Sequence, residues 1–222
     1  MKEDPDKTGG QWPDLVLIDG GRGQLGVTLE VFEELGIEDV AVAAIASLKE
    51  AKSEMVMGKA DAMVTIIEFS SLGCSHCAAF HRETLPQIKK DYIDTGKVRL
   101  IFQDFPLGTP ALAAAMVARC AGPKKYFGFV EILFRSQAQW SRSKNPIEAL
   151  TNVARFGGLS GDDVKACLNY QPLLEHIRKG ALVGQEDYKI NSTPSFVIGN
   201  EIISGAQPYE VFQKAFDKAL KK

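Results

Sequence analysis

Two cysteines, Cys74 and Cys77, stand two residues apart in the stretch "SLGCSHCAAFH" (residues 71–81), directly after the apolar run "MVTIIEFS". Such a pair can hold a metal ion, form a permanent disulfide bond, or exchange a disulfide with other proteins. A chain of 222 residues that is 45% hydrophobic can bury a core without cross-links, which favours chemistry over scaffolding. A zinc site needs four ligands, and the sequence has no second Cys-x-x-Cys; His81 would be a third ligand at most. We therefore expect a redox pair, with no metal and no cofactor.

The cysteine pair follows a predicted strand and begins a predicted helix. Residues 63–70 are apolar and indicate a buried strand, and residues 74–94 carry apolar side chains at helical spacing. Cys74 would then lie among the unpaired N–H groups of a helix N-terminus, which stabilise a thiolate. A lowered pKa makes Cys74 a better nucleophile and leaving group and makes the disulfide a stronger oxidant. Cys77, one turn later, would be more buried and would resolve mixed disulfides.

Two ionisable side chains accompany the pair. His76 stands between the cysteines, where its imidazole could give a hydrogen bond or a positive charge to the Cys74 sulfur; alternatively it faces solvent without a role. Glu68 stands inside the apolar strand, where a carboxylate is costly unless it accepts a proton from Cys77 or finds a partner. The alternative is an edge strand with Glu68 facing water.

The elements that follow complete an order of β-α-β, helical insert and β-β-α. Residues 98–106 predict a strand, and helical periodicity then continues over about 109–186. "TPSFVIG" and "EIISG" indicate a hairpin, and residues 208–220 indicate an amphipathic closing helix. Pro194 stands at the start of the first hairpin strand, where proline is typical of a turn or a cis bond. A cis Thr193–Pro194 bond would present the backbone of Thr193 to an incoming peptide.

The stretches "TIIEFSSLGCSHCAAFHRETLP", "ARCAGPKKYF" and "INSTPSFVIGNEIISGAQPYEVF" resemble the DsbA family of bacterial thiol oxidases, over about residues 55–222. The resemblance implies an α/β protein, with a thioredoxin fold and an inserted α-helical domain, over residues 48–222. It implies that the protein introduces disulfide bonds into exported proteins by dithiol–disulfide exchange. The implied roles are a nucleophilic Cys74, a resolving Cys77, a buried acid at Glu68 and a cis-proline loop at Thr193 and Pro194. Ser75 stands where the family more often has proline, which bears on the redox potential.

The other two cysteines, Cys120 and Cys167, flank the inserted helices. Some members of the DsbA family have a second, structural disulfide there, so the resemblance implies one here. The alternative is a pair of buried free thiols.

The resemblance also implies partners and a location. The substrates would be reduced, unfolded or folding exported proteins, and the reoxidising partner would be a membrane quinone-linked enzyme of the DsbB type. The location would be the periplasm, although "MKEDPDKTGGQWPD" is acidic and polar, unlike a signal peptide. We expect a monomer that binds no nucleic acid, because no Lys/Arg cluster stands out. The alternative function is a disulfide isomerase or reductase of the same fold, which usually needs a dimerisation segment.

Residues 1–47 differ from the rest, with 3 basic and 10 acidic side chains. "WPDLVLIDGGRGQLGVTLEVFEELGIEDVAVAAIA" resembles part of the C-terminal nuclease domain of UvrC, in which the position of Asp19 is a metal-binding carboxylate. Metal-dependent cleavage needs several ligands, and this segment has one of the family's acidic positions and lacks its downstream histidine. We therefore expect a short, unrelated and non-functional β-α-β fragment, with a role as a DNA-repair binding module as the third functional alternative. The charged stretch after residue 47 indicates a junction.

Overall fold

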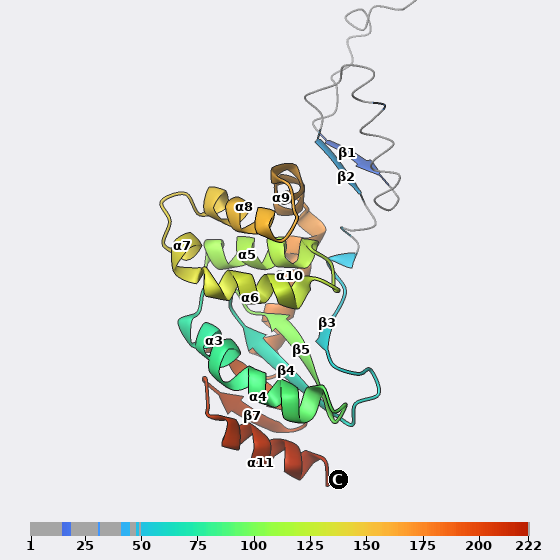
Figure 1. Cartoon of the computed structure of the whole chain (residues 1–222), viewed down its shortest axis with the longest axis vertical. Helices are drawn as coiled ribbons and strands as arrows, with labels where there is room; N and C mark the ends of the chain where they lie inside the picture. The colour runs from blue at the N-terminus through green and yellow to red at the C-terminus, as the bar shows by residue number, and fades with distance from the viewer. Residues whose placement is uncertain (1–14, 19–30, 32–40, 45–47, 49, 222) are drawn as a thin grey trace, which may run out of the picture.

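The computed structural model describes residues 15–18, 31, 41–44, 48 and 50–221 (Figure 1). Near the N-terminus, strands β1 (Leu15–Ile18) and β2 (Ala41–Ala44) pair in parallel, with Leu15 opposite Ala41. They form a two-stranded sheet of their own. Of the helix expected between these two strands the structure describes Val31, which is helical, and Asp19 lies outside the described residues.

A five-stranded sheet has the order β3-β5-β4-β6-β7. Its strands are β3 (Met55–Met57), β4 (Val64–Ser70), β5 (Val98–Asp104), β6 (Ser195–Ile198) and β7 (Glu201–Ser204). The central strand β4 runs parallel to β5 and antiparallel to β6. β3 lies within the stretch that the sequence indicates as a junction. Its strand character could not be predicted, because three residues are too few to show a period of two. The expected strand over 98–106 ends at Asp104, opposite Ser70 at the end of β4, and the Phe105 N–H still donates to the Ser70 carbonyl oxygen (2.7 Å).

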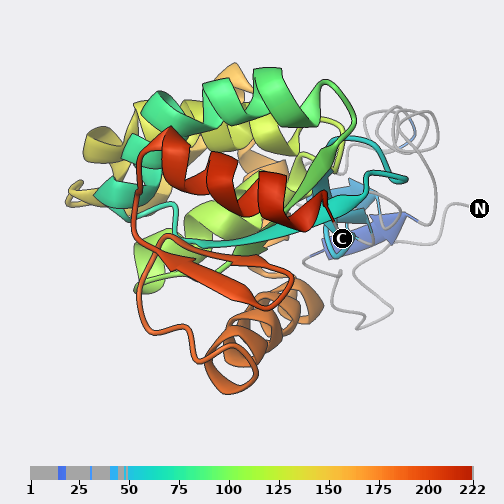
Figure 2. The same ribbon diagram turned by 90° about the horizontal axis from the view of Figure 1, so that it is seen from below.

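Helices cover both faces of this sheet. One face, which carries Glu68 and Phe102, lies under α6 (Tyr126–Arg135), α11 (Tyr209–Ala219) and the helical run that follows Cys74. The opposite face lies against α10 (Gln171–Glu186), where Gly184 leaves room for the ring of Phe69. Figure 2 shows α11 and α10 on opposite sides of the strands. A thioredoxin-like α/β sandwich, as the resemblance implied, is therefore confirmed.

The helical run after Cys74 spans the predicted range but is not a regular α-helix. It consists of α3 (Ser75–Ala79), η2 (Phe80–Thr84), α4 (Leu85–Ile88) and η3 (Lys89–Ile93), of which η2 and η3 are π-helical. Pro86 has no N–H to continue an α-helical ladder, which fits a wider turn just before it. Periodicity alone cannot distinguish such turns from an α-helix.

The helical insertion runs from Thr109 to Glu186 and contains α5 (Thr109–Cys120), α6, α7 (Gln137–Ser141), α8 (Pro146–Phe156), α9 (Gly161–Leu168) and α10. Polar side chains cap the starts of two of its helices. The Asn145 side chain accepts from the Glu148 N–H at the start of α8, and Ser160 forms a capping box with Asp163 at the start of α9. No helix of the described residues is long and apolar enough to cross a membrane.

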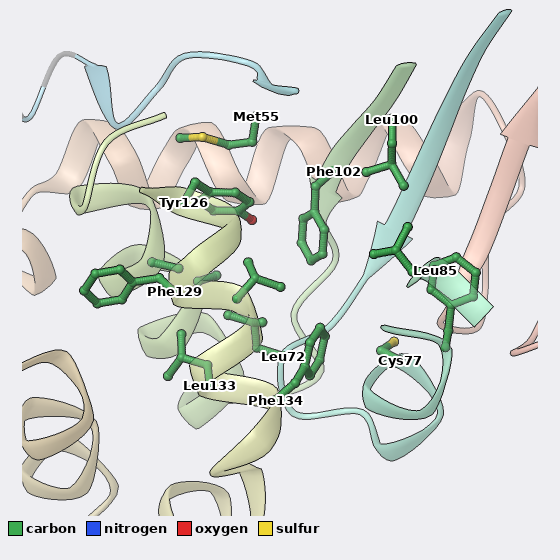
Figure 3. Close-up of a cluster of buried hydrophobic side chains, with 14 of the residues drawn as sticks. Met55, Leu72, Cys77, Leu85, Leu100, Phe102, Tyr126, Phe129, Leu133 and Phe134 are labelled. Atoms are coloured by element: carbon green, nitrogen blue, oxygen red, sulfur yellow. The ribbon is translucent and has the colours of Figure 1, made fainter. Parts of the chain in front are cut away.

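The hydrophobic core joins the sheet to the insertion and includes the second cysteine of the pair. Figure 3 shows Cys77 in this cluster, together with Leu72 and with the α6 side chains Tyr126, Phe129 and Phe134. The side chain of Cys77 is completely buried. Burial in apolar surroundings disfavours the charged form of a thiol.

Candidate active site

The loop that carries Cys74 is held in place by hydrogen bonds. The Cys74 N–H donates to the Ser71 carbonyl oxygen (3.0 Å), which closes a turn between β4 and α3. The Ser71 hydroxyl oxygen accepts from the N–H groups of Gly73 (3.3 Å) and Leu107 (3.1 Å). One serine thus ties the cysteine loop to the segment after β5.

Cys74 is partly exposed and faces the loop before β6. Its thiol donates to the Thr193 carbonyl oxygen (3.3 Å), and the Thr193–Pro194 peptide bond is cis. A hydrogen bond from the Cys77 thiol lowers the pKa of Cys74 to about 5, with the Thr193 hydroxyl and the N–H groups of Cys77 and His76 acting in the same direction against burial. Cys74 is therefore a thiolate at neutral pH, which is the nucleophilic form.

Cys77 has the opposite character. It is free but fully buried, and its sulfur accepts from the Ser71 N–H (3.5 Å). Burial raises the pKa of this thiol, and the neighbouring Cys74 raises it further. The pair therefore combines an accessible thiolate with a buried thiol that keeps its proton, a division that suits the attacking and resolving roles implied by the family.

His76 lies between the cysteines with an exposed side chain. Its backbone N–H group helps to lower the pKa of Cys74. That its imidazole gives a hydrogen bond or a positive charge to the Cys74 sulfur stays a prediction.

Glu68 lies in the middle of the sheet. β4 has a neighbour on each side, so the alternative of an edge strand with Glu68 in water is wrong, and the side chain is 0% exposed. Its two carboxylate oxygens lie 2.9 and 3.1 Å from Nε2 of His81, whose side chain is 9% exposed. Among the described residues, no direct hydrogen bond joins Glu68 to Cys77. The proton-acceptor role therefore stays a prediction, and the partner of Glu68 is a histidine.

The sequence alone offers His81 only as a third metal ligand. No cluster of metal-ligating side chains large enough for a metal ion occurs within the described ranges. The signal for the contact with Glu68 was the spacing, since His81 follows Cys77 by four residues and so lies on the same helical face over β4. His81 also lines a pocket of about 430 Å³ between η2–α4 and α6.

We predict that Glu68→Gln slows turnover and leaves the protein folded. If the carboxylate accepts the Cys77 proton through His81 or water, the amide removes that path, and the rate falls by roughly 100-fold, the low end for a positioned proton acceptor. Stopped-flow measurement of thiol–disulfide exchange between pH 5 and 8 checks this. Unchanged rates over that range would count against any such role.

The other two cysteines, Cys120 and Cys167, form a disulfide bond with a Cα–Cα distance of 6.2 Å. It joins the end of α5 to α9, so it closes a loop with a sequence separation of 47 residues within the insertion. The alternative of two free thiols is wrong. Cys167 is completely buried, which keeps this bond away from substrates.

We predict that replacing both Cys120 and Cys167 with alanine lowers the free energy of unfolding by on the order of 4 kcal/mol, the chain-entropy value for a loop of this length. The dithiol exchange rate should stay the same, because the bond is remote from the cysteine loop. Denaturant unfolding of the double variant checks the first part. A loss of less than about 1 kcal/mol would contradict it.

Together, the sheet, the helical insertion, the reduced cysteine pair and the cis-proline loop define a thioredoxin-fold protein with a dithiol centre. The thioredoxin family model matches residues 50–218, so the chain belongs to this family. Its relatives and structural neighbours are DsbA-like.

Three relatives illustrate the likeness. A Rickettsia felis protein, provisionally named a protein-disulfide oxidoreductase, is 32% identical over 77% of this chain and 61% of its own length. Disulfide bond formation protein D of Bacillus subtilis is 27% identical over 80% of this chain and 82% of its own. The crystal structure of Wolbachia pipientis alpha-DsbA1 matches with a TM-score of 0.70 and 29% identity, covering 76% of this chain and 92% of that one. The chain spans about three fifths of the length of several Rickettsia relatives.

The N-terminal resemblance is also confirmed. The UvrC RNase H endonuclease domain model matches residues 2–73. UvrABC system protein C of Novosphingobium aromaticivorans is 62% identical over 46 residues, which are 21% of this chain and 7% of that protein. The match covers a small part of that protein, and the expectation that this fragment is non-functional stays a prediction.

Proposed function

We propose that this chain is a thiol:disulfide oxidoreductase that introduces disulfide bonds into exported proteins through Cys74 and Cys77. The observation that carries the proposal is the pair itself, in which a partly exposed Cys74 with a pKa lowered to about 5 stands beside the buried thiol of Cys77. The relatedness to Bacillus subtilis disulfide bond formation protein D supports the same activity.

The proposed reaction transfers one disulfide in two steps. A substrate thiolate attacks the Cys74 sulfur of the oxidised protein, the Cys74–Cys77 bond breaks, and the Cys77 sulfur leaves and takes up a proton. A second substrate thiolate then attacks the substrate sulfur of the mixed disulfide and expels Cys74 as a thiolate. The substrate loses two electrons and the protein gains them. Expulsion of Cys74 is fast because a thiol of low pKa is a good leaving group.

The loop before β6 would hold the substrate backbone. In the reduced protein the Cys74 sulfur lies 3.3 Å from the Thr193 carbonyl oxygen. Neither the Cys74 thiolate nor the sulfur of a mixed disulfide can donate to this carbonyl, so it can accept an N–H of an extended substrate. Pro194 has no N–H to donate to a neighbouring strand, although its carbonyl oxygen accepts from the Gly205 N–H (2.8 Å). A site that pairs with the substrate backbone would accept substrates of many different sequences.

The protein ends each turnover reduced, so the proposal requires an oxidising partner. We assign this role to a membrane quinone-linked enzyme of the DsbB type, and we place the reaction in the periplasm with exported proteins as substrates. The relationship to DsbA-like proteins supports these assignments. We expect the working form to be a monomer.

A single-turnover assay tests the function. Oxidised protein is mixed with an equal amount of a reduced peptide that contains two cysteines, and both products are analysed by mass spectrometry. We expect one peptide disulfide for each protein that becomes reduced at Cys74 and Cys77. A protein that stays oxidised, or that reduces insulin efficiently without oxidising the peptide, would overturn the proposal in favour of a reductase.

A further inference from the structure

A side chain of the helical insertion hydrogen-bonds to the backbone of the cysteine loop. Gln137, the first residue of α7, donates from Nε2 to the carbonyl oxygens of Leu72 (2.6 Å) and Cys74 (3.0 Å). These two carbonyls stand on either side of Gly73. The contact spans more than 60 residues of sequence and connects the insertion to the backbone of the cysteine loop itself.

The loop has fixed points on both sides. The Ser71 side chain holds it from the segment after β5, and Gln137 holds it from the insertion. Gly73 lies so close to α5 that an added Cβ would be 3.1 Å from the Cβ of Ala111, so this side of the loop is closed as well. Without Gln137, the peptide groups on either side of Gly73 lose their hydrogen bonds to the insertion.

The orientation of the Cys74 peptide group matters for the sulfur. The Cys74 carbonyl oxygen also accepts from the Ala78 N–H (3.1 Å), so it begins the first turn of α3. That turn carries the N–H groups of His76 and Cys77 that favour the Cys74 thiolate. A rotation of this carbonyl would turn the sulfur and these N–H groups away from one another.

We propose that Gln137 is a positioning residue for the redox pair, by which the helical insertion fixes the cysteine loop in the geometry that stabilises the Cys74 thiolate. The proposal rests on the proposed function. The hydrogen bonds of Gln137 go to backbone carbonyl oxygens and to neither sulfur atom, so Gln137 acts through the backbone. The insertion would thereby set the oxidising strength of the thioredoxin domain.

The test compares Gln137→Ala and Gln137→Glu with Gln139→Ala. Gln139 lies on the same short helix, is exposed, and its side chain has no hydrogen bond in the part of the chain that the structure describes. Two quantities are measured: the pKa of the Cys74 thiolate, from its ultraviolet absorbance, and the equilibrium constant of the Cys74–Cys77 pair with glutathione. Circular dichroism reports whether each variant is folded.

We expect Gln137→Ala to weaken the acidity of Cys74 by about 3- to 10-fold, the size of one or two ordinary hydrogen bonds, and to make the pair less oxidising by a similar factor. Gln137→Glu should shift both more, because a carboxylate not only fails to donate but also repels the two carbonyl oxygens and the Cys74 thiolate. Gln139→Ala should shift neither.

Folded Gln137 variants that match Gln139→Ala in both quantities would overturn the proposal. Loss of the folded state in both Gln137 variants would overturn it as well, because the side chain would then serve the fold as a whole. Neither result depends on the proposed function, whose failure would show in the unaltered protein as an inability to oxidise a dithiol peptide.

Discussion

Cys74→Ala abolishes oxidation of dithiol substrates, with an expected loss on the order of 1,000-fold or more, as for removal of other catalytic nucleophiles. The reason is that no other cysteine can replace it. Cys77 is fully buried and keeps its proton, and Cys120 and Cys167 are bonded to each other. The measurement is the rate of peptide disulfide formation with glutathione disulfide as oxidant. Substantial remaining activity would contradict the assignment of Cys74 as the attacked sulfur.

Cys77→Ala is the matched control because it separates the two roles. Cys74 stays accessible in this variant, and its thiolate can attack a one-cysteine peptide that is supplied as its mixed disulfide with glutathione, which expels glutathione as a thiolate. Neither Cys77 nor a second peptide thiol can then resolve the Cys74–peptide disulfide, so we expect this covalent complex to accumulate, visible by mass spectrometry without reductant. An equal accumulation in Cys74→Ala would reverse the roles of the two residues.

The reduced protein is expected to be more stable than the oxidised protein at pH 7, and this difference should shrink as the pH falls towards 5. The pKa of Cys74 is about 5 in the folded protein and about 8.5 in an unfolded chain. A lowered pKa stabilises the folded state fully above the unfolded value, and the effect is lost as the pH falls through the folded value. The oxidised protein has no Cys74 thiol, so it lacks this dependence.

Thermal unfolding of both forms at pH 4, 5.5, 7 and 8.5 checks this prediction. The Cys120–Cys167 bond must stay intact in both forms. Because Cys167 is buried, a reductant should reduce the Cys74–Cys77 bond selectively. A difference between the two forms that is constant from pH 4 to 8.5 would show that Cys74 has an ordinary pKa.

The sequence predicted those parts of the site that depend on local pattern. Cys74 and Cys77 follow a strand and lie at the start of a helix, and Pro194 directly precedes a strand, so their places could be inferred from hydrophobic periodicity and proline chemistry. Glu68 could be recognised as unusual because a carboxylate interrupts an apolar run. The order of elements was predicted from the same patterns, whereas the thioredoxin fold itself was implied by the resemblance to the DsbA family.

The contacts between distant elements could not be inferred in this way. The spacing places His81 on the same helical face as Cys77, but it does not show that His81 binds Glu68, because this depends on how the helical run crosses β4. It does not show that Gln137 reaches the cysteine loop, because glutamines on helix surfaces are common and only the packing of the insertion selects this one. Both contacts depend on tertiary structure, which periodicity does not encode.

The reduction potential of the Cys74–Cys77 pair tests the central claim most directly. The protein is equilibrated with glutathione buffers of known ratio, and the reduced fraction is determined after acid quenching and thiol labelling. Because the Cys74 thiolate stabilises the reduced form, we predict an oxidising potential of roughly −180 to −120 mV, the range from protein disulfide isomerase to DsbA. A value near −270 mV, as in thioredoxin, would contradict the account and would indicate a reductase.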